Sequence, residues 1–275
     1  MTTRLIRSRP LLAFVVLACL VGWLPYLLAA AGVGSEPENF PLGPVVAAAI
    51  VTACCGRDIL AAWGRRVRDV RVPLVWLAVA LLLPVAMHIV QVLINHGFGA
   101  PLPTSAQLAG WTSVPVSFVM MLILVGIGEE AGWTAYATPL LLHRYSFGTT
   151  FAVMAAIRIG WHLPLMLTGN LPWVLGTLGN AGFQLVLLCL YRLSGDRWFT
   201  AAVAHASLNA LGGPFLFQMV TGADRARLAV IMAVAYTLLG LVLAAVVARR
   251  TGPLSAPPSG GSRSPRRAAA TVSSS

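Results

Sequence analysis

Long apolar runs alternate with short polar segments along the chain, from about residue 10 to residue 248. Most of these runs approach the ~20 residues that a helix needs to cross a bilayer. The pattern therefore predicts an all-α, polytopic integral membrane protein with about eight transmembrane helices. The predicted spans cover residues 10–31, 42–56, 72–94, 110–129, 148–168, 171–191, 199–221 and 228–248.

The segments between and beyond these runs predict the remaining organisation. We expect residues 1–250 to form one transmembrane domain. The segment 57–71 alternates apolar and basic residues, which is typical of a helix lying along the head groups. We expect the aromatic-rich segment 131–147 to lie in the same way beneath the fourth span. The tail, 251–275, is rich in Ser, Pro, Gly and Arg, and we expect it to be disordered and cytoplasmic.

Composition and charge agree with a membrane protein. Hydrophobic residues make up 58% of the chain and charged residues 10%, against roughly 25% charged residues in a soluble domain. The net charge of +11 comes from arginines that cluster beside apolar runs, and no basic face interleaved with aromatics indicates nucleic-acid binding. The positive-inside rule predicts both termini in the cytoplasm, because only Arg158, Arg225 and Arg227 then lie outside cytoplasmic segments. We expect a multi-pass protein of a bacterial plasma membrane.

The four cysteines all lie in apolar runs, without a CxxC spacing. We interpret them as small buried hydrophobic residues and not as disulfide partners or zinc ligands. The first apolar run follows three arginines, as the core of a signal peptide would. Its length of about 20 residues nevertheless predicts an uncleaved first span.

A few charged or titratable side chains fall inside the predicted spans, where each charge costs about 2.5–3.5 kcal/mol and usually has a function. They are Glu129, Glu130, Arg158, His162 and His205. A lone imidazole, His88, stands apart in the third span, and we expect it to be a neutral side chain bonded to a neighbouring helix.

Helix geometry indicates that the two adjacent glutamates have different roles. Adjacent residues point about 100° apart, so Glu129 and Glu130 cannot both aim at one point; one would meet the reacting centre while the other anchors the site. The alternative is that both are solvated at the end of the fourth span. Pro164 predicts a kink beside His162. His205 and Asn209, four residues apart, share one face of the seventh span.

Water activation is the chemistry that fits this set. A carboxylate can act as general base, neutral imidazoles can hold a water or a metal, and an asparagine can donate to an oxyanion. Glu129, His162 and His205 would suit zinc with an open fourth position. The HExxH helix of soluble metalloproteases is absent, so the sequence leaves the presence of zinc open.

Three short motifs resemble those of the CPBP family, which comprises type II CAAX prenyl proteases, bacteriocin-processing enzymes and the Abi group. The family shows EExxxR, aromatic-xxx-His and HxxxN/D motifs on successive membrane helices. The matching stretches here are GEEAGW (128–133), GWHLP (160–164) and AHASLN (204–209), within a CPBP-like core of about 105–215.

The resemblance implies a glutamate-dependent intramembrane endopeptidase, with a cavity open to the cytoplasmic leaflet and a membrane-associated or lipidated peptide as substrate. It implies that Glu129 is the catalytic base and Glu130 its support. It also implies that His162 and His205 position the attacking water or a zinc ion, and that Asn209 lies on the oxyanion side.

Two positions depart from the family pattern. Thr134 stands where EExxxR has its arginine, and Arg158 stands where the second motif has its aromatic residue. One hypothesis is that Arg158 reaches the glutamate pair, replaces the missing cation and keeps a carboxylate ionised. Two alternatives are that Arg158 extends to the cytoplasmic interface, or that the exchange marks a chain that has lost catalysis.

Two other classes of function stay open alongside the protease. A catalytically inactive member of the same fold would bind a membrane partner as an immunity or scaffold protein. A proton-coupled transporter would also use buried Glu and His, although the chain shows no internal repeat of the kind that many transporters carry.

Overall fold

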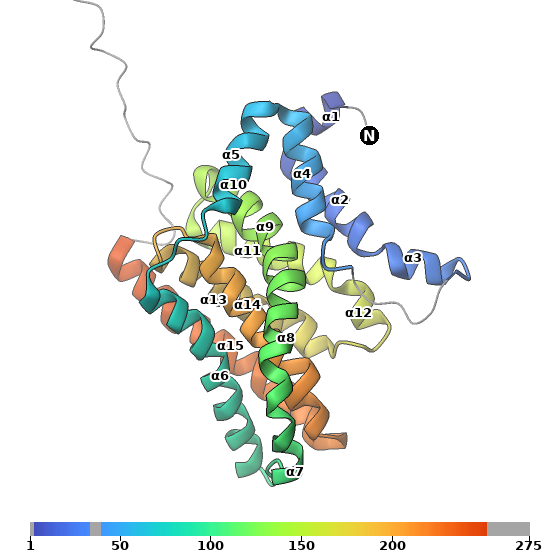
Figure 1. Cartoon of the computed structure of the whole chain (residues 1–275), viewed down its shortest axis with the longest axis vertical. Coiled ribbons are helices and arrows are strands. Elements are labelled where there is room, and N and C mark those ends of the chain that lie inside the picture. Colours follow the sequence, from blue (N-terminus) through green and yellow to red (C-terminus); the bar gives the residue numbers. More distant parts are fainter. Residues whose placement is uncertain (1–2, 34–39, 252–275) are drawn as a thin grey trace, which may run out of the picture.

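The computed structural model describes residues 3–33 and 40–251, and the regular secondary structure of these residues is entirely helical (Figure 1). The tail predicted to be disordered lies, from residue 252 onwards, outside the described residues. The α-helices are α1 (Thr3–Ser8), α2 (Pro10–Gly22), α3 (Leu24–Ala30), α4 (Gly43–Cys55), α5 (Arg57–Arg68), α6 (Leu74–Gly97), α7 (Ser105–Leu108), α8 (Val114–Met121), α9 (Gly128–Gly132), α10 (Thr138–Arg144), α11 (Phe147–Trp161), α12 (Leu163–Leu167), α13 (Asn180–Leu193), α14 (Trp198–Leu211) and α15 (Gly222–Thr251).

Every apolar run of the sequence carries helix, but the helices differ in length. Within the described residues, three are long and apolar enough to cross a membrane: Leu74–Gly97, Ser105–Arg144 and Gly222–Arg250. A fourth such span arises if α2 and α3, which bend by 51° at their junction, are counted together. The apolar helices α4 and α11 are shorter. The all-helical, multi-span prediction is thus confirmed in its coarse form.

The stretch from Ser105 to Arg144 runs as one helical rod of 40 residues. The segment expected to lie beneath the fourth span, residues 131–147, continues the same helix through α9 and α10 as far as Arg144 (Figure 1), and its orientation to the membrane stays a prediction. Residues 128–138 of this rod are buried. Small side chains explain the burial: a Cβ on Gly132 would lie 2.5 Å from the carbonyl carbon of Pro44, so the rod and the start of α4 touch backbone to backbone.

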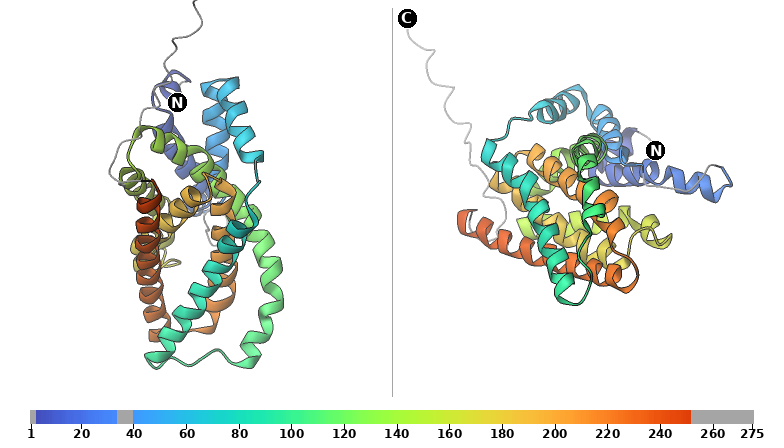
Figure 2. Two further views of the ribbon diagram at one scale, coloured as in Figure 1. Left: turned by 90° about the vertical axis from the view of Figure 1, so that its left-hand side faces the viewer. Right: turned by 60° about the horizontal axis from the view of Figure 1, so that its bottom comes forward.

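The other long helices pack against one another and along one side of this rod, whose first half includes α8. Both views in Figure 2 show α6, α8, α13, α14 and α15 running side by side, while α2 and α4 form a pair beside one end of the bundle. α13 and α15 approach closely, since a Cβ on Gly182 would lie 2.6 Å from the backbone nitrogen of Thr237. The consequence is a tightly packed interior into which α9, α11 and α14 carry the polar residues singled out by the sequence.

Candidate active site

The two adjacent glutamates lie on α9, which is enclosed by two π-helical segments, Leu122–Ile127 and Trp133–Ala137. A π-helical turn widens the backbone and is frequent at functional sites. The hydroxyl of Thr138 donates to the carbonyl of Trp133, five residues earlier, over 2.9 Å. These π-helical segments lie directly before and directly after the helix that carries the two glutamates.

Glu130 is the anchored member of the pair. Its side chain has no exposed surface, and both oxygens have partners. The hydroxyl of Thr134 donates to Oε2, and the guanidinium of Arg158 donates to Oε1. Since a carboxylate can only accept, Nδ1 of His205 donates to the same Oε1, over 2.7 Å. Three elements thus meet at this one carboxylate.

Glu129 has a different environment although it is also buried, with 4% of its surface exposed. Its Oε2 atom has no hydrogen-bond partner among the described residues. The nearest cation is Nη1 of Arg158, at 3.9 Å. The alternative in which both glutamates are solvated at a helix end is therefore wrong. One carboxylate is tied down, and the other presents a free oxygen inside the protein.

Arg158 lies on α11 and is 2% exposed. It points into the glutamate pair and not toward the membrane interface, and its guanidinium carbon lies 5.9 Å from the centre of the Trp133 ring. Thr134, at the position of the family's arginine, faces the same carboxylate because it stands four residues after Glu130. Arg158 on α11 therefore supplies to Glu130 the positive charge that Thr134 lacks.

His162 occupies the break between α11 and α12, where Pro164 predicted a kink. Its Nδ1 donates to the carbonyl of Arg158 over 2.8 Å. In a neutral ring this leaves Nε2 unprotonated and able to accept a hydrogen bond or bind a metal. The ring packs edge to face on Trp161, with 4.9 Å between centroids.

His205 and Asn209 share one face of α14, as their spacing predicted. Nδ1 of His205 is bonded to Glu130, so its Nε2 is also the free nitrogen of a neutral ring. The ring lies against Phe183, with 5.4 Å between centroids. The side-chain nitrogen of Asn209 donates to the carbonyl of His205 over 3.1 Å, which uses one of its two N–H groups.

A compact set of potential metal ligands is formed by Glu129, Glu130 and His205, whose ligand atoms all lie within 4.8 Å of one another. His162, which the sequence placed among the zinc ligands, is not in this set. Both histidines nevertheless use Nδ1 for a carboxylate or carbonyl, which is how a metal-binding histidine is normally held. The donor chemistry therefore fits zinc, with Glu130 supporting His205 from behind.

His88 lies outside this cluster. It bonds through Nε2 to the carbonyl of Leu208 on α14, over 3.2 Å, so the expected bond to a neighbouring helix is confirmed. The sequence search missed Gln91 and Asn95, which lie on the same face of α6 and are buried. Asn95 accepts from Nε of Arg227 over 2.8 Å. Neutral amides escape a search for charged groups, and the i+3 and i+7 spacing from His88 was the available signal.

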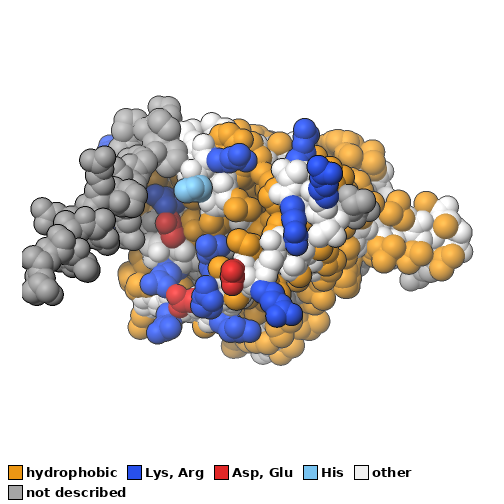
Figure 3. Space-filling view, turned by 90° about the horizontal axis from the view of Figure 1, so that it is seen from above, with side chains coloured by type: hydrophobic (Ala, Val, Ile, Leu, Met, Phe, Trp, Pro, Cys, Tyr) orange, Lys and Arg blue, Asp and Glu red, His pale blue; other side chains and the backbone are white. Residues whose placement is uncertain are grey.

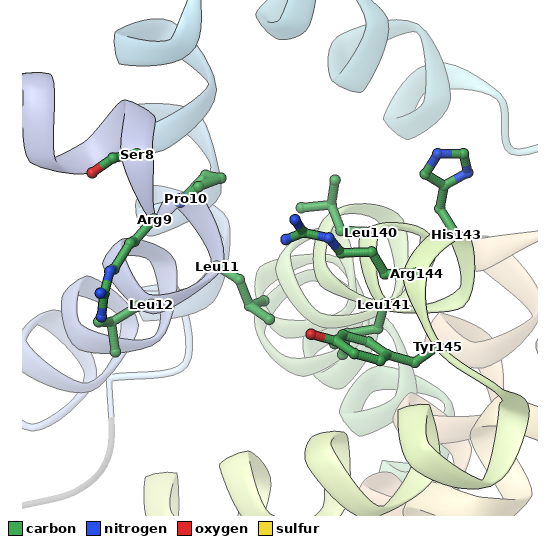
Figure 4. Close-up of a pocket in the computed structure, with 10 residues that line it drawn as sticks. All are labelled: Ser8, Arg9, Pro10, Leu11, Leu12, Leu140, Leu141, His143, Arg144 and Tyr145. Carbon is green, nitrogen blue, oxygen red and sulfur yellow. The ribbon is translucent and has the colours of Figure 1, made fainter.

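A cavity of about 490 Å³ opens at the far end of the glutamate-bearing rod. Figure 4 shows Arg9 and Leu11 on one side of it, facing Arg144 and Tyr145 on the other. None of the predicted site residues lines this cavity. It lies next to α10, beyond the carboxylate cluster, and is separate from the proposed chemistry.

Comparison with known proteins supports the motif analysis. Residues 110–211 match the family model described as Rce1-like, type II CAAX prenyl endopeptidase. The matched stretch contains all three motifs, from Glu129 to Asn209, and this confirms the resemblance to the CPBP family. No curated protein matches the chain.

Proposed function

We propose that this chain, whose residues 110–211 belong to the Rce1-like type II CAAX prenyl endopeptidase family, is an intramembrane endopeptidase that hydrolyses a peptide bond in a membrane-associated protein or peptide. The proposal rests on one observation, which is that the two glutamates have different hydrogen-bond partners. Glu130 has three hydrogen-bond partners, whereas the buried Oε2 of Glu129 has no hydrogen-bond partner among the described residues and faces the guanidinium of Arg158 only at 3.9 Å. A general base needs this kind of free, shielded oxygen.

In the proposed mechanism Glu129 removes a proton from a water as the water oxygen attacks the scissile carbonyl. The unprotonated Nε2 atom of one of the two histidines, His162 or His205, accepts a hydrogen bond from the second O–H of that water and holds it in line. The second N–H of Asn209 donates to the oxyanion that forms. Glu129 then gives the proton to the leaving nitrogen, and Glu130 with Arg158 keeps His205 in its tautomer throughout.

Zinc is compatible with the same residues. Glu129 and the free Nε2 atoms of His205 and His162 would hold it, and it would polarise the carbonyl and acidify the water. We propose glutamate-dependent hydrolysis as the common feature of both cases. Metal analysis of the purified protein, repeated after chelation and dialysis, decides whether zinc takes part.

The proposed topology has eight spans with both termini in the cytoplasm. In support, α6 and α15 are long enough to cross the bilayer, and the arginines of α1, α5 and the residues after α13 then share one side. Labelling of single cysteines with a membrane-impermeant reagent tests the orientation: a cysteine at Thr221 should react from outside, and one at Gly64 only after the membrane is permeabilised.

The function is tested by incubating wild type and Glu129→Gln with prenylated and unprenylated membrane peptides. We expect cleavage by the wild type and by the control His143→Gln, which changes an exposed histidine outside the cluster, but not by Glu129→Gln. Equal cleavage by wild type and Glu129→Gln would overturn the assignment of the base. Binding without cleavage by the wild type would favour the inactive, partner-binding alternative, which the exchange at Thr134 and Arg158 also motivates.

A further inference from the structure

The amphipathic helix α5 connects α4 to α6 at the end of the bundle that also holds α10 (Figure 1). Its apolar positions, Ile59, Leu60, Trp63 and Val67, share one face because they follow helical spacing. Trp63 and Val67 pack against the protein core. Ile59 and Leu60 remain 50% and 36% exposed, so part of this apolar face is left uncovered by the protein.

The same helix is hydrogen-bonded directly to the segment that carries the glutamates. The indole nitrogen of Trp63 donates to the carbonyl of Ala131 over 3.0 Å, and Nη1 of Arg66 donates to the carbonyl of Ala135 over 2.9 Å. These two carbonyls belong to the residues that directly follow Glu130 and Thr134. Since a carbonyl has two lone pairs, it can accept such a bond in addition to a helical one. α5 is therefore coupled to the backbone of the proposed active site.

The opposite face of α5 carries Arg57, Arg65 and Arg68, all exposed. No described residue forms an ion pair with any of these three, whereas Arg192 and Arg197 on the same side of the molecule are paired with aspartates. Figure 3 shows that basic side chains outnumber acidic ones on the end of the molecule seen from above, with acidic side chains standing among them. Unpaired arginines above exposed apolar residues complement an anionic lipid surface, which attracts basic segments close to a membrane.

We propose that α5 binds anionic phospholipid head groups through Arg57, Arg65 and Arg68 and inserts Ile59 and Leu60 beneath them, and that Trp63 and Arg66 transmit this docking to α9. The lipid surface then holds the backbone around Glu130 and Thr134 in the conformation that pairs Glu130 with Arg158 and His205. For its effect on catalysis the inference rests on the proposed function, but the lipid contact and the ordering of α9 do not.

The test compares the wild type in two kinds of nanodisc. One contains phosphatidylcholine alone, and the other contains equal parts of phosphatidylcholine and the anionic lipid phosphatidylglycerol. Hydrogen–deuterium exchange over residues 128–137 should slow several-fold in the anionic discs. The variant Arg57→Gln/Arg65→Gln/Arg68→Gln should lose this response. Its matched control, Arg4→Gln/Arg9→Gln/Arg144→Gln, removes three exposed arginines outside α5 and should keep it. Exchange that is equal in both lipids, or equal loss of the response in both triple variants, overturns the inference.

A second variant separates lipid binding by α5 from the effect of that binding on α9. Trp63→Phe keeps the aromatic packing and removes only the N–H donor, so exchange in the segment should respond less to the anionic lipid while the exchange of α5 itself still slows. An unchanged response would rule out the coupling. If the wild type cleaves no peptide in either lipid, the proposed function fails, and the exchange measurements still decide the inference. If it cleaves, the rate should rise in the anionic discs for the wild type and the control alone.

Discussion

Replacing Arg158 by phenylalanine tests whether the charge on α11 stands in for the arginine that the family has four residues after its second glutamate. In the wild type, the carboxylate of Glu130 has no exposed surface and pairs with a guanidinium that is itself 2% exposed. Arg158→Phe removes the cation and restores the aromatic residue of the family motif. Glu130 keeps only Thr134 and His205 as partners.

The expected loss of stability follows from the burial of the ion pair between Arg158 and Glu130. Removing one partner of a buried ion pair leaves an uncompensated charge, which costs about 3–5 kcal/mol of the free energy of unfolding. The control is Arg192→Gln, which breaks an i,i+4 pair whose side chains are 31% and 48% exposed. Because solvent screens such a pair, the control should cost at most about 0.5 kcal/mol.

A compensating change sharpens the test. Thr134→Arg by itself adds a second guanidinium to a packed site and should destabilise the protein. Combined with Arg158→Phe, it should recover stability, since residue 134 already faces Glu130. We expect a favourable coupling of about 1–3 kcal/mol between the two positions, in the range measured for residues of one network.

Equilibrium unfolding in mixed micelles of the wild type, both single variants, the double variant and the control measures these terms. Peptide cleavage by the same samples reports on the active site. An Arg158→Phe variant as stable as the control, or additive effects of the two substitutions, would refute the idea that Arg158 replaces the missing arginine.

Three further outcomes are expected from the same measurements. Glu129→Gln should abolish cleavage without lowering the free energy of unfolding, because the buried Oε2 that it replaces makes no hydrogen bond and lies 3.9 Å from its nearest cation, Arg158, whose closer partner is Glu130; clear destabilisation would contradict this. Gly132→Ala should lower the free energy of unfolding by about 1–3 kcal/mol, because the new Cβ would meet the backbone of Pro44 at 2.5 Å. Gly160→Ala has nothing within 4 Å of its new Cβ and should leave the free energy of unfolding unchanged or raise it by up to about 1 kcal/mol. Equal effects of the two substitutions would refute the close packing at Gly132. Thr134→Val should cost about 1–3 kcal/mol by removing a donor to Glu130, and an unchanged unfolding midpoint would show that this bond contributes nothing.

The amino-acid sequence by itself determined the secondary structure and the set of polar residues. Apolar runs of near-spanning length predicted where helices form, because lipid leaves the backbone no other way to satisfy its hydrogen bonds. Pro164 predicted the break at His162, since proline has no N–H to donate to Gly160. The cost of polar groups in lipid pointed to Glu129, Glu130, Arg158, His162 and His205 before any contact was known.

Only the tertiary structure decided what these groups do to one another. Helical spacing says which residues share a face, but not which neighbouring helix covers that face. The glycines of α9 let α4 approach and bury the segment that the sequence assigned to the interface. That packing excludes the solvated alternative for the glutamates, directs Arg158 to Glu130, and leaves the buried Oε2 of Glu129 free. The division between an anchored and a free carboxylate is therefore a property of helix–helix contact, which no single stretch of the sequence records.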